Sequence, residues 1–338
     1  MRKRVGPIVK IFAVVCLLAC AAPSALAQDE GDLLAKRRVF DPVGPGLRAV
    51  KRGPDGNFYV LTAPATTVSV FDASGKVLKN IPAYEANRGP QSAQLMGISF
   101  GEDLDVDASG TVYVADRGAN AIKLWQSDGS AHMFSVNAPV SVAALPEGEI
   151  AVATLREPHL VIVFEKNGRE VREFGDPEPL TERADLNRYL NIGQLVTDAQ
   201  AHLYYAFAFM PEPTVRQYDR LGYAGQDIQY TSIDVMPSAR AARKEIERQE
   251  RRGDQPSIRR VITGVGVDRA NGEVWIALGN SLLHFDKDGN RRATYKIYTP
   301  KGARLEANTI LIESDRLIIG NDPLGIYEFA RPEKISPK

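Results

Sequence analysis

A recurring aromatic residue in front of a glycine turn constrains the fold of this chain more than any other feature. One copy of the repeat covers residues 104–129 and reads as strand, Ser-Gly turn, strand, polar loop, strand and Asp-Gly turn. Because a large ring buries the most area between two surfaces, we expect the recurring rings to pack between neighbouring sheets. Six copies carry one at the end of the third strand: Phe71, Trp125, Phe164, Tyr218, Phe285 and Phe329.

The second strand of the repeat recurs as regularly as the aromatic residue. Six short segments follow a turn and alternate or run apolar, as buried strands do: 57–61, 111–115, 149–153, 202–206, 273–277 and 316–320. Six small sheets at this spacing predict an all-β fold, a six-bladed β-propeller with four-stranded blades over residues 36–330. Residues 331–338 are expected to form a tail.

The sixth unit predicts how the ring closes. It supplies strands near 308–313, 316–320 and 325–329 and then runs into the charged tail, so its sheet lacks a fourth strand. A strand-like segment at 36–43 precedes the first unit and has no other place in the repeat. We predict that this segment is the outer strand of the last blade, which ties the two ends of the ring together and protects an edge.

The unit at 106–125 resembles the NHL repeat almost throughout, including the run Val-Tyr-Val-Ala-Asp at 112–116. The other five units match that repeat more loosely. The chain is therefore similar to the NHL-repeat, TolB-like family of six-bladed propellers, as an exported bacterial member. The resemblance implies the fold and leaves function open, since the family includes enzymes, binding proteins and scaffolds.

The first 27 residues have the pattern of a cleaved signal peptide. A basic stretch at 2–10 precedes an apolar run at 11–18, and Ala-Leu-Ala at 25–27 offers a cleavage site. An alternative cut lies before Cys20, where Leu-Leu-Ala-Cys resembles a lipobox and the cysteine would carry a lipid anchor. The apolar run is too short to span a bilayer, and no later segment is long and apolar enough. We expect a periplasmic or secreted protein, or alternatively one that is lipid-anchored to the envelope.

Composition excludes several classes of function. Lys+Arg and Asp+Glu number 42 each, so no basic field points to nucleic acid. Both cysteines, Cys16 and Cys20, lie in the leader. The folded part therefore has no disulfide, no thiol nucleophile and no cysteine-ligated metal. We expect a monomer whose partner is an unknown protein or small molecule.

Extra residues accumulate in three connections, at about 82–103, 175–193 and 230–263. Each lies between the last strand of one blade and the first strand of the next. In a propeller these connections share one face with the loops between second and third strands. Insertions that gather on one face often mark the binding face, so we predict that function lies there.

One insertion, between blades four and five, is predicted to be helical at 236–253. Ser238 is the expected N-cap of a helix from Ala239 to about Arg252. The helix is rich in basic residues. One interpretation is a basic arm that contacts an acidic partner or a membrane headgroup. The favoured interpretation is a solvated surface helix.

The residues predict no catalytic set, no metal and no cofactor. Lactonase-like propellers hold Ca²⁺ with Glu, Asn and Asp from separate blades, but no matching Glu opens the first inner strand, which lies near Leu47-Arg48-Ala49. Asn308 and Asp105 alone do not complete the set. Related lyases need several histidines. Of His132, His159, His202 and His284, the register places two on outer strands, one at a strand start and only His159 in a face loop.

Polar residues in loops of the predicted binding face are the candidate ligand contacts. Arginines among them suit a carboxylate or phosphate group. The favoured function is a non-catalytic propeller that binds a ligand or protein in the envelope or outside the cell. The alternatives are a metal-dependent hydrolase, lactonase or lyase, and an envelope scaffold. The candidate residues are Arg88, Asp116, Arg117, Asn120, Arg156, His159, Asn280 and Asp322.

Overall fold

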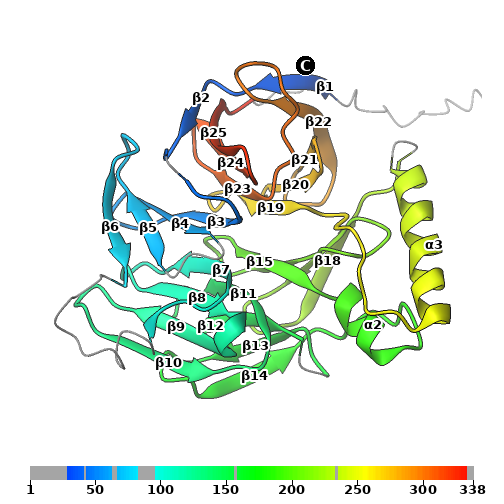
Figure 1. Ribbon diagram of the computed structural model, residues 1–338, viewed down its shortest axis with the longest axis horizontal. Helices are drawn as coiled ribbons and strands as arrows, with labels where there is room; N and C mark the ends of the chain where they lie inside the picture. Colours follow the sequence, from blue (N-terminus) through cyan, green and yellow to red (C-terminus); the bar gives the residue numbers. More distant parts are fainter. Residues whose placement is uncertain are drawn as a thin grey trace, which may run out of the picture.

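Six β-sheets surround a common centre in the computed structural model (Figure 1). The structure describes residues 29–332 except 42, 63–66, 83–95, 156–157 and 233–234. In each sheet one strand faces the centre and contacts the inner strands of both neighbouring blades. The predicted six-bladed propeller with four-stranded blades is therefore confirmed.

The first three blades follow the repeat in chain order. From the inner strand outward, blade one contains β3 (Leu47–Arg52), β4 (Phe58–Thr62), β5 (Val68–Phe71) and β6 (Val77–Ile81). Blade two contains β7 (Gly101–Val106), β8 (Val112–Asp116), β9 (Ala121–Trp125) and β10 (Ala131–Ser135). Blade three contains β11 (Pro139–Ala144), β12 (Ile150–Thr154), β13 (Val161–Phe164) and β14 (Glu170–Phe174).

The last three blades keep the same order. Blade four contains β15 (Gly193–Thr197), β16 (Leu203–Phe207), β17 (Thr214–Tyr218) and β18 (Ala224–Gln229). Blade five contains β19 (Gly264–Val267), β20 (Val274–Leu278), β21 (Ser281–Phe285) and β22 (Arg291–Tyr298). Blade six contains β23 (Thr309–Ile312), β24 (Arg316–Asn321) and β25 (Gly325–Ala330).

The N-terminal segment closes the ring as predicted. Strand β2 (Arg37–Val39) pairs antiparallel with β25 as the outer strand of blade six, and the Arg37 guanidinium bonds the Glu328 carboxylate at 2.9 Å. The sequence did not predict a further strand, β1 (Asp29–Leu34), which pairs parallel with β22 and gives blade five a fifth strand. Its run Asp-Glu-Gly-Asp has neither the alternation nor the β-branched residues that signal a strand.

The recurring aromatic residues form the core between blades. All six are buried, with at most 7 % of their surface exposed. Phe71 packs with Phe40 and with Ile318 of blade six, and Phe285 packs against Tyr204 of blade four. The prediction that these rings lie between neighbouring sheets is confirmed.

The turns after first and third strands define one end of the ring, here called the tight-turn face. At this face the Asp107 carboxylate accepts hydrogen bonds from the Thr111 amide at 2.9 Å, the Tyr113 hydroxyl at 2.7 Å and the Lys166 ammonium at 2.7 Å. Burial opposes ionisation of Asp107, but the bonds from Lys166, Ser109 and Tyr113 outweigh it and lower its pKa to about 2. This carboxylate is a structural part of the turn.

The opposite end, where the connections after second and fourth strands emerge, is called the insertion face. Helix α3 (Met236–Arg252) lies in the insertion between blades four and five, as predicted, and stands at the periphery beside β18 (Figure 1). Its N-cap is Val235 and not Ser238, so that detail of the prediction is wrong. The helix starts earlier because Pro237 fits the first turn, where no backbone N–H is needed.

A second helix, α2 (Ala184–Leu190), lies in the insertion between blades three and four and was not predicted to be helical. It has no side-chain cap, and only Leu186 and Leu190 are buried, so its sequence carries little helical signal. Among the described residues, no helix has the length and apolar character that a membrane span requires.

Candidate functional site

The inner strand of each blade is an edge of its sheet. Polar side chains of the neighbouring blade form hydrogen bonds with some of its backbone groups. Asp103 of blade two accepts the Ser141 hydroxyl of blade three, and Asp105 accepts the Ala144 amide at 2.9 Å. The Ser141 oxygen in turn accepts the Leu195 amide of blade four at 2.9 Å. Because an unpaired N–H is costly inside a narrow channel, these polar side chains hold the ring together.

The Asp103 carboxyl has an unusual environment for an acid. Burial raises its pKa to about 6, although Lys51 and the Ser141 hydroxyl oppose that shift. It lies on β7 in the wall of the central channel, which here narrows to a cavity of about 20 Å³. A ligand larger than a few atoms therefore has room only at the ends of the channel.

Irregular pairing at the start of three consecutive inner strands shapes one end of the channel. In blades one, two and three the strand register shifts at Arg48, Glu102 and Val140, which are equivalent positions of the repeat. Bulges of this kind re-aim side chains and recur beside functional sites. Arg48 and Glu102 meet across the two blades with their charged atoms 3.8 Å apart.

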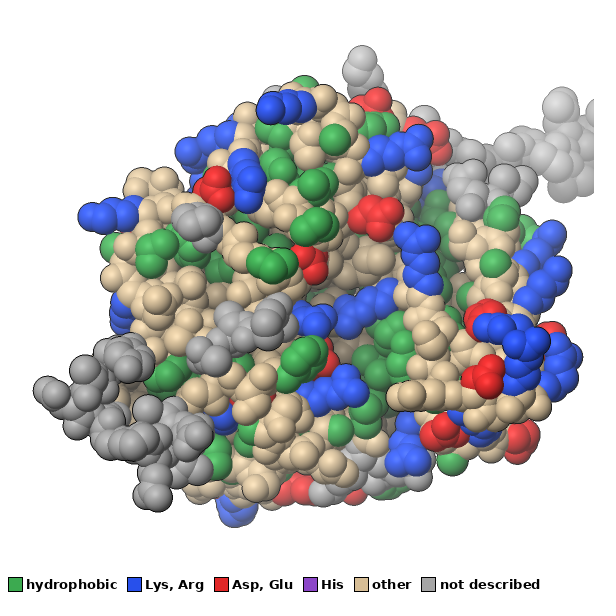
Figure 2. Space-filling model, viewed as in Figure 1, with side chains coloured by type: hydrophobic (Ala, Val, Ile, Leu, Met, Phe, Trp, Pro, Cys, Tyr) green, Lys and Arg blue, Asp and Glu red, His purple; other side chains and the backbone are tan. Residues whose placement is uncertain are grey.

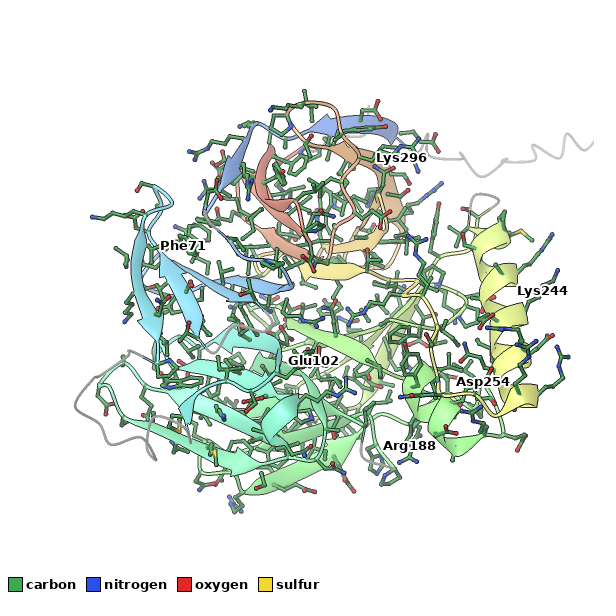
Figure 3. All side chains as sticks on the ribbon, viewed as in Figure 1. Phe71, Glu102, Arg188, Lys244, Asp254 and Lys296 are labelled. Atoms are coloured by element: carbon green, nitrogen blue, oxygen red, sulfur yellow. The ribbon has the colours of Figure 1, made fainter. Side chains whose placement is uncertain are left out.

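We call this end of the channel the channel mouth and define it by Arg48, Phe100, Glu102, Arg117, Phe209 and Arg260. Glu102 lies near the centre of the ring (Figure 3), with its carboxylate 3.0 Å from the Arg117 guanidinium. The Arg48 guanidinium lies 5.2 Å from the centre of the Phe100 ring. Lys and Arg side chains gather around a hollow in this face (Figure 2).

Arg260 brings a further positive charge to the channel mouth. It lies on the segment between α3 and β19, with its guanidinium 5.8 Å from the centre of the Phe209 ring. Burial lowers the pKa of Arg260, Glu102 opposes that shift and Arg48 adds to it. Within the part of the chain that the structure describes, Arg260 has no carboxylate within 4.0 Å. The mouth thus holds three guanidinium groups around one carboxylate.

The opposite end of the channel differs in its charges. It opens at the tight-turn face into a funnel of about 960 Å³. Arg331 on its rim bonds Glu273 at 2.8 Å, and it also pairs with Asp268. Lys51 lies 3.8 Å from Asp105. These charges are balanced within the fold.

Asp116, a predicted ligand contact, is fully buried at the end of β8. Its carboxylate accepts the Ser99 and Phe100 amides at 2.8 Å each and lies 2.9 Å from the buried Lys123 ammonium. It anchors the connection that enters blade two. Among the predicted contacts that the structure describes, its neighbour Arg117 is the one that reaches the channel mouth.

Three other predicted contacts bond the backbone of a nearby loop. The Asn120 side-chain oxygen accepts the Ala138 amide at 3.0 Å, and Asp322 accepts the Gly46 amide at 2.9 Å. Asn280 donates to the Ile297 carbonyl at 2.9 Å. All three belong to the insertion face, but the structure does not bring them together.

Three predicted ligand contacts remain, and the structure describes one of them, a histidine. His159 lies in its face loop, 3.6 Å from Glu173 and 3.8 Å from Asp176. Arg88 and Arg156 lie outside the described residues. His132 is on the outer strand β10 and His202 precedes β16, as expected, whereas His284 is on β21, the third strand of its blade.

Sequence reasoning missed Arg48, Glu102 and Arg260. Arg48 and Glu102 are each the second residue of their inner strand, so an alignment of strand starts offers a signal for them. Arg260 lies in an irregular segment, and its approach to the mouth depends on how that segment runs. Nothing in the repeat predicts it.

The channel mouth does not suit a divalent cation. Glu102 is the one carboxylate among the described residues that define it, and two guanidinium groups lie within 4.0 Å of this carboxylate. Within the described ranges, no group of three His, Cys, Asp or Glu side chains is close enough to hold a metal ion. The residues at the mouth therefore do not fit the Ca²⁺ set that the lactonase-like resemblance implies.

Comparison with known proteins identifies the fold. No family model and no curated protein matches the chain. A streptogramin B lyase structure is 13% identical with a TM-score of 0.55, over 88% of this chain and 87% of that chain. A gluconolactonase from Xanthomonas campestris is 16% identical with a TM-score of 0.57, over 87% of this chain and 89% of that chain. A virginiamycin B lyase from Staphylococcus aureus is 14% identical with a TM-score of 0.51, over 88% of each chain.

Identities this low show the six-bladed propeller fold and nothing finer. The three named structures are all enzymes, and what their activities suggest for this chain is a matter for proposal. The assignment to NHL repeats in particular stays a prediction.

Proposed function

We propose that the channel mouth binds a small molecule that carries a carboxylate or phosphate group, and that Arg48 and Arg260 hold this group. The excess of positive charge supports the proposal, since Glu102 is the one carboxylate among three guanidinium groups and lies closest to Arg117. Arginine stays protonated in proteins, so Arg260 keeps its charge although it is largely buried. An anion between the two guanidinium groups relieves their repulsion.

The surroundings of the two arginines fit a small molecule. Phe100 is 36% exposed beside Arg48, and the Phe209 ring lies beside Arg260. Both rings offer an apolar surface next to the anion site, as small-molecule sites commonly do. The narrow channel below stops the ligand at the mouth, so its recognition rests on the insertion face.

A second candidate is an enzyme that opens or forms a ring in such a molecule. Its support is the fold shared with a gluconolactonase and with lyases, which is an argument from fold alone. The chemistry of the mouth is compatible with it, because hydrolysis of a lactone produces a carboxylate that Arg48 and Arg260 are suited to hold. We further propose that the protein works outside the cytoplasm, on the signal-like pattern of residues 1–27.

Titration calorimetry with gluconate and with inorganic phosphate tests the first candidate. We expect the protein to bind at least one of them, and Arg48→Ala and Arg260→Ala each to weaken binding about tenfold. The matched control is Arg240→Ala, which removes an exposed arginine of α3 away from the mouth. Absence of binding to both probes, or equal losses in the control, contradicts the proposal.

Turnover tests the second candidate. Purified protein is assayed with gluconolactone and with virginiamycin B, the compounds in the names of the similar structures. Hydrolysis or ring opening that Arg48→Ala abolishes would support an enzyme with its site at the mouth. Turnover that survives both arginine variants would place the reaction elsewhere in the molecule.

A further inference from the structure

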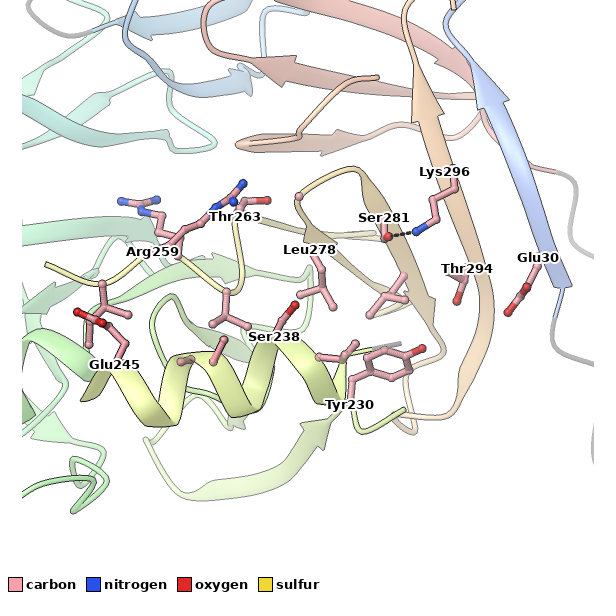
Figure 4. A pocket seen from close by; sticks show the side chains of 18 of the residues that line it. Glu30, Tyr230, Ser238, Glu245, Arg259, Thr263, Leu278, Ser281, Thr294 and Lys296 are labelled. Carbon is pink, nitrogen blue, oxygen red and sulfur yellow. Dashed lines mark hydrogen bonds between the residues drawn. The ribbon is translucent and has the colours of Figure 1, made fainter. Parts of the chain in front are cut away.

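A cavity of about 900 Å³ lies between α3 and blade five (Figure 4). Neighbouring blades diverge with distance from the centre, so the space between them widens toward the periphery. Between blades four and five, part of this space is filled by Tyr230, which packs edge-on against Phe285 with ring centres 6.2 Å apart. Toward α3 the space stays empty, and its volume is within the range of small-molecule sites.

The two halves of α3 differ in how they meet the protein. In the C-terminal half, Ile246 packs with Leu186 and Phe209, and Gln249 donates to the Ser257 carbonyl at 2.8 Å. From residue 238 to residue 245, one face of the helix lines the cavity with short side chains and one glutamate: Ser238, Ala241, Ala242 and Glu245. The cavity-lining face thus stands clear of blade five, whereas Arg243 on another face of the helix pairs with Glu212 in the loop before β17.

The cavity has an apolar floor and two polar ends. Leu278, Leu283 and Val261 form the floor. At one end Lys296 donates to the Ser281 hydroxyl (Figure 4), and the acidic residue Asp32 is its direct neighbour across the β1–β22 pairing. Glu30 also lines this end, so negative charge exceeds positive charge there.

The other end carries an excess of positive charge. Arg259 and Arg260 both line it, and the nearby Glu245 carboxylate already bonds Arg248 and Gln249. Arg259 has one weak partner, Glu306 at 3.4 Å, and both of these side chains are mostly exposed. An anionic group entering the cavity is attracted to this end, while an apolar body gains from covering the floor.

We propose that this cavity binds the apolar body of an elongated amphipathic molecule whose anionic group lies at Arg260. The inference rests on the proposed function, because Arg260 belongs to both the channel mouth and the cavity. It extends that function by naming the ligand class: a carboxylate or phosphate joined to an apolar chain or ring system that fits beneath α3.

Binding of octanoate, with octan-1-ol as its neutral counterpart, tests the proposal by titration calorimetry. Ala242→Leu fills the cavity and is expected to weaken octanoate binding at least about tenfold. Ala241→Leu is the second filling variant, in case the first perturbs the fold. The matched control is Lys244→Leu, which adds the same side chain on the face of α3 that points away from the protein (Figure 3).

A comparison of octanoate with octan-1-ol tests the contribution of the Arg260 charge separately. Arg260→Ala is expected to weaken octanoate about tenfold and to leave octan-1-ol unchanged. Undiminished octanoate binding in both filling variants, with unfolding temperatures like that of the unmodified protein, overturns the proposal, as does a protein that binds no octanoate. If Ala242→Leu still binds gluconate or phosphate, the channel mouth binds its anion independently of the cavity. Failure of the cavity proposal can therefore be told apart from failure of the proposed function at the mouth.

Discussion

The two faces of the propeller use charged residues in different ways. At the tight-turn face, carboxylates such as Asp107 bond turn amides and basic side chains, and Arg331 pairs with two acids. At the insertion face, the Arg48 guanidinium lies 3.8 Å from the Glu102 carboxylate, and Arg260, which is close enough to feel the charges of both, has no carboxylate within 4.0 Å among the described residues. A face whose charges are satisfied internally stabilises the fold, whereas unsatisfied charges leave the protein ready for a ligand.

Asp116 offers the strongest test of that comparison, because it lies at the insertion face and is bonded like a tight-turn carboxylate. Asp116→Ala is expected to cost about 3–5 kcal/mol of unfolding free energy, since it leaves the buried Lys123 unpaired. Urea denaturation measures the loss. The control is Asp322→Ala, an exposed residue with one backbone bond, which is expected to cost about 1 kcal/mol or less. Equal losses would remove the distinction between the two kinds of carboxylate.

A pair of arginines, one from each face, sharpens the comparison. Arg331→Ala strips a half-buried cluster of its cation and is expected to cost about 3 kcal/mol of unfolding free energy. Arg48→Ala is expected to cost less than about 1 kcal/mol, because it removes repulsion with Arg260 together with the contact to Glu102. Thermal unfolding of both variants provides the measurement. A large loss in Arg48→Ala would mean that the mouth is built for stability.

Two carboxyl groups, Asp103 within β7 and Asp107 just after it, are predicted to respond to pH in opposite directions. The pKa of Asp103 is raised to about 6, so its contribution to stability is complete below about pH 4 and is lost as pH rises through 6. The pKa of Asp107 is lowered to about 2, so its contribution is present above about pH 4 and is lost as pH falls toward 2.

Asparagine variants separate the two contributions. Asp103→Asn is expected to remove a fall in stability on the order of 2 kcal/mol between pH 4 and 6, and Asp107→Asn to weaken the acid-induced loss below pH 4. Urea midpoints measured from pH 3 to 7 record both slopes. Parallel curves for the two variants would refute the opposed shifts.

The smallest expected effect concerns metal ions. With two guanidinium groups beside Glu102, added Ca²⁺ is expected to leave the unfolding temperature unchanged after treatment with EDTA. A bound metal at about 100 times its Kd would add roughly 2.7 kcal/mol and raise that temperature by a few degrees. Such a rise would revive the metal-dependent enzyme and assign the metal to residues away from the mouth.

The sequence predicted those parts of the fold that the repeat encodes. The aromatic residue before each turn, the strand order and the closing strand all follow from a pattern in which each copy supports the others. Strand β1 and helix α2 lie outside the repeat and were missed. Their short or polar sequences adopt regular structure because the neighbouring strand or loop provides the partner.

The candidate site was harder to predict, because its residues act through positions that the repeat does not encode. Arg117 was identified from its loop, but Asp116, one residue earlier, turns inward and bonds the backbone. Arg48 and Glu102 reach the mouth through register shifts, which depend on pairing in three dimensions. Arg260 arrives there on an insertion whose path no local pattern fixes.

Ring closure by β2 has a consequence for the order of assembly. Residues 37–39 are made long before their partners at 326–328, so blade six completes its sheet only after nearly the whole chain is available. Contacts of such sequence separation form late and slow the approach to the native state. Any truncation that removes β25 leaves β2 without a partner, and the chain then exposes two strand edges in place of a closed circle.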